Sequence, residues 1–597
     1  MNVKAIVNIF MSIQGPILCK ATAPTSCGVD ATFDRDHEDK PYIDGSHLKG
    51  KLREALREIG TSNTQITEWF GTEGELENGI IFFNPLYCAT QPKEGAVLHR
   101  IKMDVNRGVV APNALLKMEN PFPPGANYDW LGTITFFAPN EEEAKQIMDE
   151  LTLGLKWITG IGSEKSIGFG KIAALRSDLK VMQFKLPKDI NPVATTNDVF
   201  PLSITARDPL LIGDVKMKAN YLESRDFITG SAVKAALAQA VNTALCIPRA
   251  AGTPLDDGNA TAKRIFPLLC KYLEHIRFTH AFPSTDATKR PVIIPLSAVF
   301  DGEKHHDVAL CKGPKLINGV APKFQTDWKE NEFPDGFGWA TPKRFTKTRT
   351  AIDWHTRRAD DGQMFTYTYV SPKDEEGSII TWLTNISLHA VAEKDRAALL
   401  VEIDVALELL EYIGKRNGRV TVKREQNKVI PFQVSAGLSP QDDRYLITLQ
   451  ADALMVDPED MLKNQTGKHL AERYKQFWSE MSGGSLEMEN NFFAEQKMLG
   501  GYLKKIRFRK EGNDYYPFYL TAAGSVFVLR TAGDRAIEVI HSWLEAGLPV
   551  PGWATERYGL TGVPLWKGCP FVPENGFGEI SVNLNWHFER RADKGGI

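Results

Sequence analysis

The chain has 597 residues, 43% of them hydrophobic, and a formal net charge of −3 from 71 Lys and Arg against 74 Asp and Glu. This length predicts several domains, and the balanced charge excludes nucleic-acid binding through overall positive charge, so such a surface must be a local basic patch. No run of 18 apolar residues occurs, which argues against a membrane-spanning helix, and seven cysteines without a C-x-x-C pair favour free thiols in a reducing cytoplasm.

The first 185 residues carry the pattern of one α+β unit. Alternation of apolar and polar residues over 2–12 predicts a first strand rather than the core of a signal peptide. Leu48, Leu52 and Leu56 share one face of a helix predicted over 46–59. The remaining predicted elements are strands over 80–84, 98–104 and 131–137, a helix over 141–157 with Asn140 as N-cap, and a last strand. This element order is ferredoxin-like.

A Gly-Ser motif at the start of the first helix occurs a second time, 185 positions later. Gly45-Ser46 with Lys49 matches Gly230-Ser231 with Lys234 without a gap. In both places a short apolar strand end runs into Gly-Ser and then into a helix. The match predicts a duplicated fold unit.

Each copy continues with a predicted hairpin and a glycine-rich closing element. The hairpin pattern covers 101–116 in the first copy and 351–365 in the second, and the closing elements are 160–172 and, more weakly, 412–420. The hairpins are offset by 249 positions against 185 for the Gly-Ser motif, so the second copy holds about 64 extra residues (249 − 185).

These patterns divide the chain into three segments. They are residues 1–185, residues 196–430 with an insertion at about 247–343, and residues 431–597. The last segment is either the C-terminal part of the second unit or a degenerate third unit, because 445–451, 523–529 and 575–580 repeat the pattern only weakly.

The repeated motifs have the chemistry of a phosphate site. A Gly-Ser helix start offers backbone N–H groups and a hydroxyl to a phosphate, and lysines and arginines nearby add positive charge. Any one of these motifs alone could also be an ordinary helix N-cap followed by a tight turn, without a phosphate. The candidate phosphate-contacting residues are Gly45, Ser46, Lys49, Arg53, Gly160, Gly162, Lys165, Gly168, Gly170, Lys171, Gly230, Ser231, Lys234, Arg357, Arg358, Lys415 and Arg416.

Tyr42-Ile-Asp-Gly-Ser46 with Lys49 and Arg53, followed by the glycines at 160–170, resembles the RAMP superfamily of CRISPR systems, above all the backbone subunits of type III effector complexes. The likeness covers most of residues 1–180, turns toward RAMP proteins of subtype D in the second unit, and fades after about residue 430. It implies tandem ferredoxin-like (RRM-like) RAMP domains with hairpin thumbs. It also implies crRNA, single-stranded target RNA and other type III effector subunits as partners, in the cytoplasm and without a membrane.

The resemblance further implies metal-dependent cutting of target RNA by an aspartate in a loop. Asp30, 15 residues before Gly45, is the candidate catalytic residue and the candidate ligand for Mg²⁺ or Mn²⁺. Asp214 is the second catalytic candidate, 16 residues before Gly230 and so one position out of register. A solvated acidic loop is the alternative for Asp30, because Asp34 and Asp36 are close by, and the loop around Asp214 is shorter and does not reproduce the first pattern.

Three other functions stay open from the sequence. The chain could be a non-catalytic crRNA-binding scaffold, a metal-free crRNA-processing endoribonuclease that uses His37 and His47, or an unrelated small-molecule enzyme on the same fold. A structural zinc is a further candidate, although the spacing of its ligands is not a standard one. These candidate zinc ligands are Cys270, His275, His280, His305, His306 and Cys311.

Overall fold

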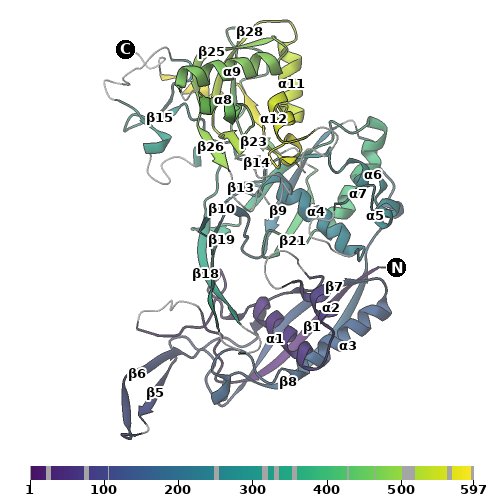
Figure 1. Cartoon of the computed structure of the whole chain (residues 1–597), viewed down its shortest axis with the longest axis vertical. Helices are drawn as coiled ribbons and strands as arrows, with labels where there is room; N and C mark the ends of the chain where they lie inside the picture. The colour runs from purple at the N-terminus through teal and green to yellow at the C-terminus, as the bar shows by residue number, and fades with distance from the viewer. Residues whose placement is uncertain are drawn as a thin grey trace.

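The computed structural model describes residues 2–21, 28–72, 79–104, 106–195, 197–218, 220–247, 254–311, 317, 321–327, 335–352, 356, 359–426, 429–463, 466–499, 518–560 and 568–592. It is a mixed α/β chain with three main antiparallel sheets, arranged one after another along the long axis (Figure 1). This agrees with the predicted fold class at the level of an α+β chain. We call the parts that contain these sheets unit one (β1–β8), unit two (β9–β22) and unit three (β24–β29).

Unit one is built on a sheet with the strand order β2-β4-β7-β1-β8, where β3 also pairs with β7. Its strands are β1 (Val3–Gln14), β2 (Tyr42–Ile43), β3 (Phe82–Phe83), β4 (Leu86–Cys88), β7 (Asn127–Ala138) and β8 (Lys171–Gln183). Its helices are α1 (Gly45–Glu58), α2 (Asn63–Phe70) and α3 (Glu141–Trp157). The strand predicted over 2–12 and the helices predicted over 46–59 and 141–157 are therefore confirmed.

Local sequence explains these helices. Leu48, Leu52 and Leu56 of α1 are fully buried, as their spacing of four predicts. Asn140 accepts a hydrogen bond from the Glu143 amide at 2.9 Å and so caps α3, whose first turn holds three glutamates. Gly154 of α3 lies against Leu52 of α1, so the two helices pack closely on one face of the sheet.

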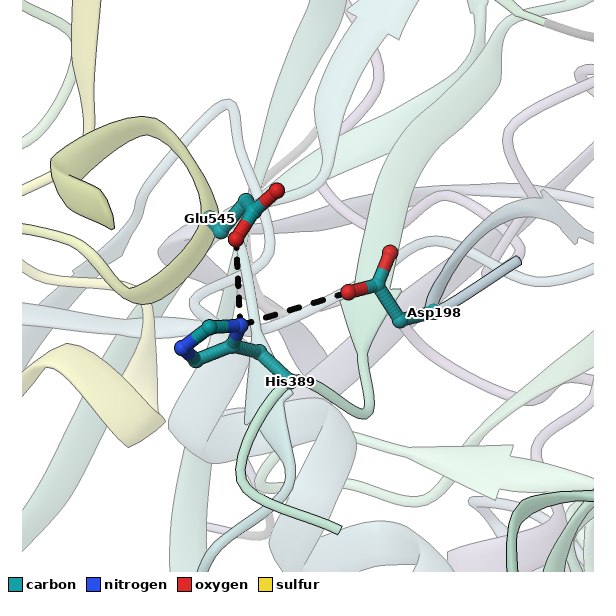
Figure 2. A group of neighbouring side chains, drawn as sticks. All are labelled: Asp198, His389 and Glu545. Carbon is teal, nitrogen blue, oxygen red and sulfur yellow. Dashed lines mark ion pairs between the residues drawn. The ribbon is translucent and has the colours of Figure 1, made fainter. Parts of the chain in front are cut away.

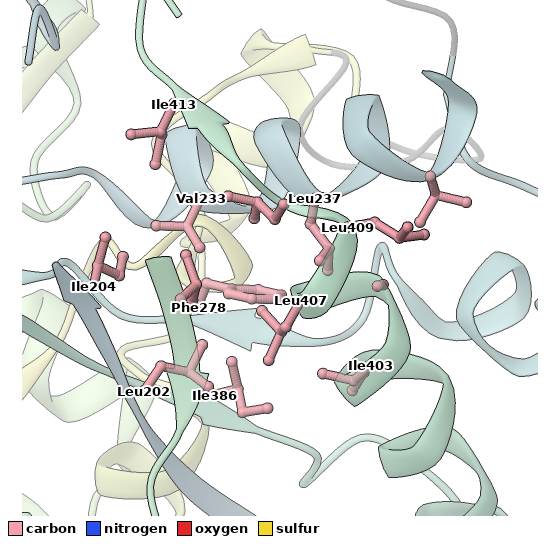
Figure 3. Packing of buried hydrophobic residues seen from close by; sticks show 14 of the residues in the cluster. Leu202, Ile204, Val233, Leu237, Phe278, Ile386, Ile403, Leu407, Leu409 and Ile413 are labelled. Carbon is pink, nitrogen blue, oxygen red and sulfur yellow. The ribbon is translucent and has the colours of Figure 1, made fainter. Parts of the chain in front are cut away.

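Unit two has a sheet of the order β12-β20-β9-β22-β21, with β13 also on β20. Its strands are β9 (Val199–Ala206), β12 (Arg277–Phe278), β13 (Phe282–Ser284), β20 (Thr381–Ser387), β21 (Tyr412–Ile413) and β22 (Gly418–Arg424). Its helices are α4 (Gly230–Ala244), α5 (Ala260–Ile265), α6 (Pro267–Tyr272) and α7 (Glu393–Leu409). Figure 3 shows Leu237 of α4, Phe278 of β12 and Ile403 of α7 packed in its core.

Unit three repeats this strand order as β25-β28-β24-β29. Its elements are β24 (Arg444–Leu449), α8 (Pro458–Lys463), α9 (Gly467–Met481), β25 (Leu486–Phe493), β28 (Val526–Thr531), α11 (Ala536–Ala546), α12 (Gly552–Arg557) and β29 (Ile580–Val582). In every unit the first strand lies between the strand that precedes the second long helix and the last strand. The weak pattern after residue 430 thus folds with the same strand order.

Two long hairpins leave the sheets where the sequence predicts them. The first is β5 (Val97–Asp104) with β6 (Val109–Glu119), and the second is β18 (Pro342–Ile352) with β19 (Ala359–Asp374). Strands β10 (Gly213–Lys218) and β11 (Tyr221–Ser224) extend the second hairpin. In Figure 1 the first hairpin projects away from the molecule, and the second runs from unit two down to α1.

The other elements are short. They are β14 (Lys289–Arg290), β15 (Ala298–Phe300), β16 (His305–Asp307), β17 (Lys323–Phe324), β23 (Ile430–Pro431), β26 (Gln496–Leu499), β27 (Phe518–Thr521) and α14 (Asn585–Glu589). Of the helices in the described ranges, none has the length and apolar character needed to cross a membrane.

Candidate nucleic-acid interface

The start of α1 is held tightly against the neighbouring strand. Asp44 caps the helix by accepting a hydrogen bond from the Ser46 amide at 2.7 Å. A Cβ on Gly45 would lie 2.3 Å from the carbonyl oxygen of Phe83, so only glycine fits there. Ser46 is exposed beside this contact. The Gly-Ser motif therefore combines a close backbone approach with an accessible hydroxyl.

Strand β18 of unit two reaches this helix start. Arg349 donates to the hydroxyl of Ser46 and forms an ion pair with Asp44. Burial opposes the ionisation of Asp44, but Arg349 and the bonds from Ser46 outweigh burial and hold the pKa of Asp44 below its ordinary value. Lys347 forms an ion pair with Asp34 at 3.2 Å. Unit two thus supplies cations to the first Gly-Ser motif.

Lys49 of α1 lies among further cations at the same contact between units. Burial, together with the charges of Arg53 and Arg416, lowers the pKa of Lys49 to about 8. Arg416 belongs to the loop between β21 and β22 of unit two, donates to the hydroxyl of Tyr367 at 3.0 Å and lies over its ring. Within the described part of the chain, neither Lys49 nor Arg416 has an ion pair with a carboxylate. We call this contact between units one and two the first interface.

Arg53, in contrast, is largely engaged in structure. Its guanidinium donates to the carbonyl oxygens of Phe70 and Gly71, both at 2.9 Å, at the end of α2. It therefore fixes α2 against α1 and adds positive charge near Lys49 from that position.

The glycine loop of unit one is folded on itself and on the chain after β1. Gly170 donates to the carbonyl of Pro16 at 2.9 Å, and Ser163 donates to that of Leu18 at 2.7 Å. A Cβ on Gly170 would lie 2.0 Å from the carbonyl oxygen of Ile161. The amides of Gly170 and Ser163 therefore already have partners within the protein. Lys165 and Lys171 are exposed on the loop, while Gly160 pairs with Lys171 and Gly168 ends a short 3₁₀ turn.

His47 connects the glycine loop to α1. Its Nε2 accepts a hydrogen bond from the Gly162 amide at 3.3 Å. Burial lowers the pKa of His47 to about 4, with Lys51 and Lys165 adding to the effect. A neutral imidazole with this nitrogen occupied is poorly placed for acid–base catalysis.

Asp30 lies at the base of the first hairpin. Its amide donates to the carbonyl of Lys117 at 2.9 Å, and its Oδ2 accepts from the amide of Lys117 at 2.7 Å. The residue is exposed. One carboxylate oxygen of Asp30 is thus held by a hydrogen bond from β6, while the residue is exposed to solvent. Such a carboxylate could bind a cation whose other ligands are water and phosphate oxygens.

The second Gly-Ser motif is enclosed by unit three. A Cβ on Gly230 would lie 1.9 Å from the carbonyl oxygen of Phe278 and 2.7 Å from that of Asn575. Lys234 is 9% exposed, and its Nζ donates to the carbonyl of Glu274 at 3.2 Å. Burial lowers the pKa of Lys234 to about 8, whereas Glu574 and Glu274 raise it. Ser231 shares a hydrogen bond of 3.0 Å with Thr229. We call this contact between units two and three the second interface.

Some predicted site residues have no described side chain. Arg357 and Arg358 lie outside the described residues, and of Asp214 only its place in β10 is described. Lys415 donates its amide to the carbonyl of Leu211 at 2.9 Å, next to Arg416.

The predicted zinc ligands do not gather in the described structure. His280 accepts from the Gly230 amide at 3.1 Å, His306 contacts Asp301 at 2.9 Å, and Cys270 lies in the core of unit two. In the parts of the chain that are described, one group of three potential ligands occurs: Asp198, His389 and Glu545 (Figure 2). His389 Nδ1 lies 3.0 Å from Glu545 Oε2 and 4.0 Å from Asp198 Oδ2, so this group joins units two and three as ion pairs.

Sequence reasoning missed a third helix start. Thr466 caps α9, Gly467 is its first residue, and His469 and Leu470 follow, as His47 and Leu48 follow Gly45. A Cβ on Gly467 would meet nothing within 4 Å. The Gly-x-His-Leu spacing shared with α1 is the sequence signal for this helix start. The Gly-Ser motif does not mark it, because Lys468 stands in place of the serine.

Comparison with known proteins adds one family match. Residues 19–173 match the RAMP superfamily. A solved structure, "Cryo-EM structure of the Type III-B Cmr-beta bound to cognate target RNA", is similar at 19% identity with a TM-score of 0.23. The similarity covers 30% of this chain and 61% of that chain, so this chain spans less than two thirds of the neighbour's length. No curated protein matches the chain.

Proposed function

Because residues 19–173 match the RAMP superfamily, we propose that the chain is an RNA-binding backbone subunit of a type III CRISPR effector complex, built from tandem ferredoxin-like units. The observation that carries the proposal is the first interface, where Lys49 of unit one and Arg416 of unit two come together without a carboxylate partner among the described residues. Burial of Lys49 and the nearby positive charges both oppose its protonated form, and an RNA phosphate beside Lys49 would offset that cost. The strand orders of the three sheets support the ferredoxin-like units.

The expected partners are a crRNA, its single-stranded target RNA and other effector subunits. The helix start with Ser46, Lys49 and Arg349 would hold backbone phosphates, which position the strand without reading its sequence. Lys165 and Lys171 on the glycine loop, Lys415 next to Arg416, and Arg357 and Arg358 in the second hairpin remain further candidates for RNA contact.

Binding is tested with the purified chain and a fluorescent single-stranded RNA. Arg416→Ala should weaken binding about tenfold and lower the slope of log affinity against log salt by about 0.7 to 0.9, the value for one lost phosphate contact. Arg424→Ala is the matched control, because Arg424 is already paired with Asp404 at 2.5 Å. Equal binding by both variants would contradict a phosphate site at the first interface.

We further propose that the chain cuts target RNA with the help of Asp30. Asp30 would hold Mg²⁺ or Mn²⁺ through its free oxygen, and the ion would stabilise negative charge on the phosphate attacked by a ribose 2′-hydroxyl. The metal-free alternative is less favoured, because His47 is buried and its Nε2 is occupied. Asp214 remains a candidate for a second cut.

Cleavage is tested in the reconstituted complex with Asp30→Ala and Asp214→Ala, separately and together. Loss of one product band in a variant assigns that cut to its unit, and EDTA should abolish the Asp30-dependent cut. If the double variant makes every cut while guide and target stay bound, the chain is a non-catalytic scaffold.

A further inference from the structure

Asp198, His389 and Glu545 bring one nitrogen and two oxygen donors together between units two and three (Figure 2). The Nδ1 of His389 lies 3.0 Å from Glu545 Oε2 and 4.0 Å from Asp198 Oδ2, and all three atoms lie within 4.8 Å of one another. Atoms with these separations fit within about 2.4 Å of one common point, close to the distance of about 2.0–2.2 Å at which zinc binds such donors. The three side chains therefore need only small adjustments to coordinate one ion.

Unit two fixes two of these ligands at one end of its sheet. Asp198 directly precedes β9, and His389 follows the last residue of β20 by two positions. The two strands are antiparallel neighbours, and Ser387 lies opposite Val199 at this end of the pair. The amide of Leu388 also donates to the carbonyl oxygen of Asp198 at 2.7 Å. The sheet therefore sets the positions from which both side chains extend.

Unit three supplies the third ligand from the end of α11. Glu545 is the last residue but one of this helix. Arg277 of β12 is buried and donates to the carbonyl oxygens of Leu544 at 3.3 Å and Glu545 at 3.0 Å. Strand β12 pairs with β20, which leads to His389. The end of α11 is therefore fixed against the same sheet that positions the other two ligands.

The charges in this cluster favour a cation. Two carboxylates lie together, and Glu545 lies at the C-terminal end of a helix, where the helix dipole is negative. A divalent cation compensates both carboxylates. The side chains of Asp198, Glu545 and His389 are 28%, 40% and 45% exposed, so an ion can enter from solvent and keep water molecules as its remaining ligands.

The donor set also indicates which metal fits. Mg²⁺ and Ca²⁺ prefer oxygen ligands, whereas an imidazole nitrogen suits transition metals such as zinc. Asp30 of unit one offers oxygen alone, so its cation belongs to the first class and the ion bound by His389 to the second. None of the three residues is among the candidate zinc ligands that the sequence suggests, because no motif spacing connects positions so far apart.

We propose that Asp198, His389 and Glu545 bind one Zn²⁺ ion, with water completing its coordination, and that this ion clamps unit three to unit two. Without the ion, the same side chains join the units only as ion pairs, which contribute little to stability when they are exposed to solvent. The site depends on neither RNA binding nor RNA cleavage, so it stands independently of the proposed function.

Titration calorimetry with Zn²⁺ on the full chain, freed of metal with EDTA, tests the site. The Asp30→Ala variant is the parent, so that the other candidate metal ligand is absent. One Zn²⁺ should bind per chain, and excess Mg²⁺ should not displace it. His389→Ala and Glu545→Gln should each weaken binding at least about tenfold. His99→Ala, at an exposed histidine of the first hairpin, is the control and should bind like the parent. Equal affinity in His389→Ala and His99→Ala would overturn the site.

Hydrogen exchange measured by mass spectrometry tests the clamp. Zn²⁺ should slow exchange of the amides in residues 387–391 and 541–547 and leave those of α1 unchanged. Glu545→Gln should abolish this protection, while its melting temperature without metal should match that of the parent, which shows that the variant is folded. Zinc binding without slower exchange in these two segments would overturn the clamp, whereas unchanged RNA binding by Arg416→Ala concerns only the proposed function.

Discussion

The two interfaces have the same architecture but opposite electrostatics. At the first, burial lowers the pKa of Lys49, and the charges of Arg53 and Arg416 add to this effect. At the second, the equivalent Lys234 faces Glu574, which raises its pKa toward the ordinary value. The contrast concerns the surroundings of the two lysines: carboxylates act on Lys234, whereas cations act on Lys49, although ion pairs join the units elsewhere in the first interface. The difference is consistent with our proposal that the first interface binds an RNA phosphate, whereas the second joins units two and three.

The largest effect is expected from reversing the charge at the second interface. Glu574→Lys places a second cation beside buried Lys234 and should destabilise the contact between units two and three by about 2–4 kcal/mol. Urea unfolding would show the lower midpoint, and Glu574→Gln should lie in between. Arg416→Glu is the mirror change at the first interface, which should leave stability equal or higher. If Arg416→Glu lowers the urea midpoint, the two interfaces do not differ in electrostatics as described.

A smaller effect is expected from pH. The pKa of Lys49 is about 8, so its charged fraction, and with it RNA affinity, should fall about tenfold from pH 7 to pH 9. The stability of the free protein should change in the opposite direction: since the unfolded lysine has a pKa of 10.5, the unfolded state binds more protons and stability rises between about pH 8 and 10.5. Lys49→Met should flatten the affinity curve, and Lys234→Met should not. An unchanged curve in Lys49→Met would exclude Lys49 as the titrating group.

The last test separates the three helix starts. Gly45→Ala and Gly230→Ala would bring a Cβ to 2.3 Å and 1.9 Å from strand carbonyls, and each should cost about 1–3 kcal/mol. Gly467→Ala meets nothing within 4 Å and should change stability by less than about 0.5 kcal/mol. Thermal melts of the three variants provide the measurement. Equal losses would mean that the third helix start is packed like the others.

The features of the fold that depend on residues close together in the sequence were predicted correctly. The leucine spacing of α1, the Asn140 cap of α3 and the two hairpins depend on local periodicity and turn chemistry, and the structure has them where predicted. The third unit was only weakly indicated, because Lys468 replaces the serine of the motif although strand order and the Gly-Phe-Gly turn at 576–578 are kept.

The site itself depends on contacts between distant residues. Arg349 and Ser46 are 303 positions apart, and no local pattern marks that they meet. The sequence predicted all of the following residues as phosphate contacts, but the fold places them in different surroundings. Lys49 and Arg416 come together across the first interface, Lys234 is enclosed by unit three, and Arg53 holds α2. Whether these residues bind RNA stays a prediction.

The covalent link between units one and two has a consequence for assembly. Strand β8 ends at Gln183 and β9 begins at Val199, so a short tether joins the two units. A tether of this kind gives the second unit an effective concentration of roughly millimolar at the first. Their contact can therefore persist although Lys49 and Arg416 repel each other, which two separate chains would have to overcome by affinity alone. The same tether fixes the stoichiometry and the order of units one and two. Two cations that would oppose the association of separate subunits therefore stay close together, where we propose that an RNA phosphate binds.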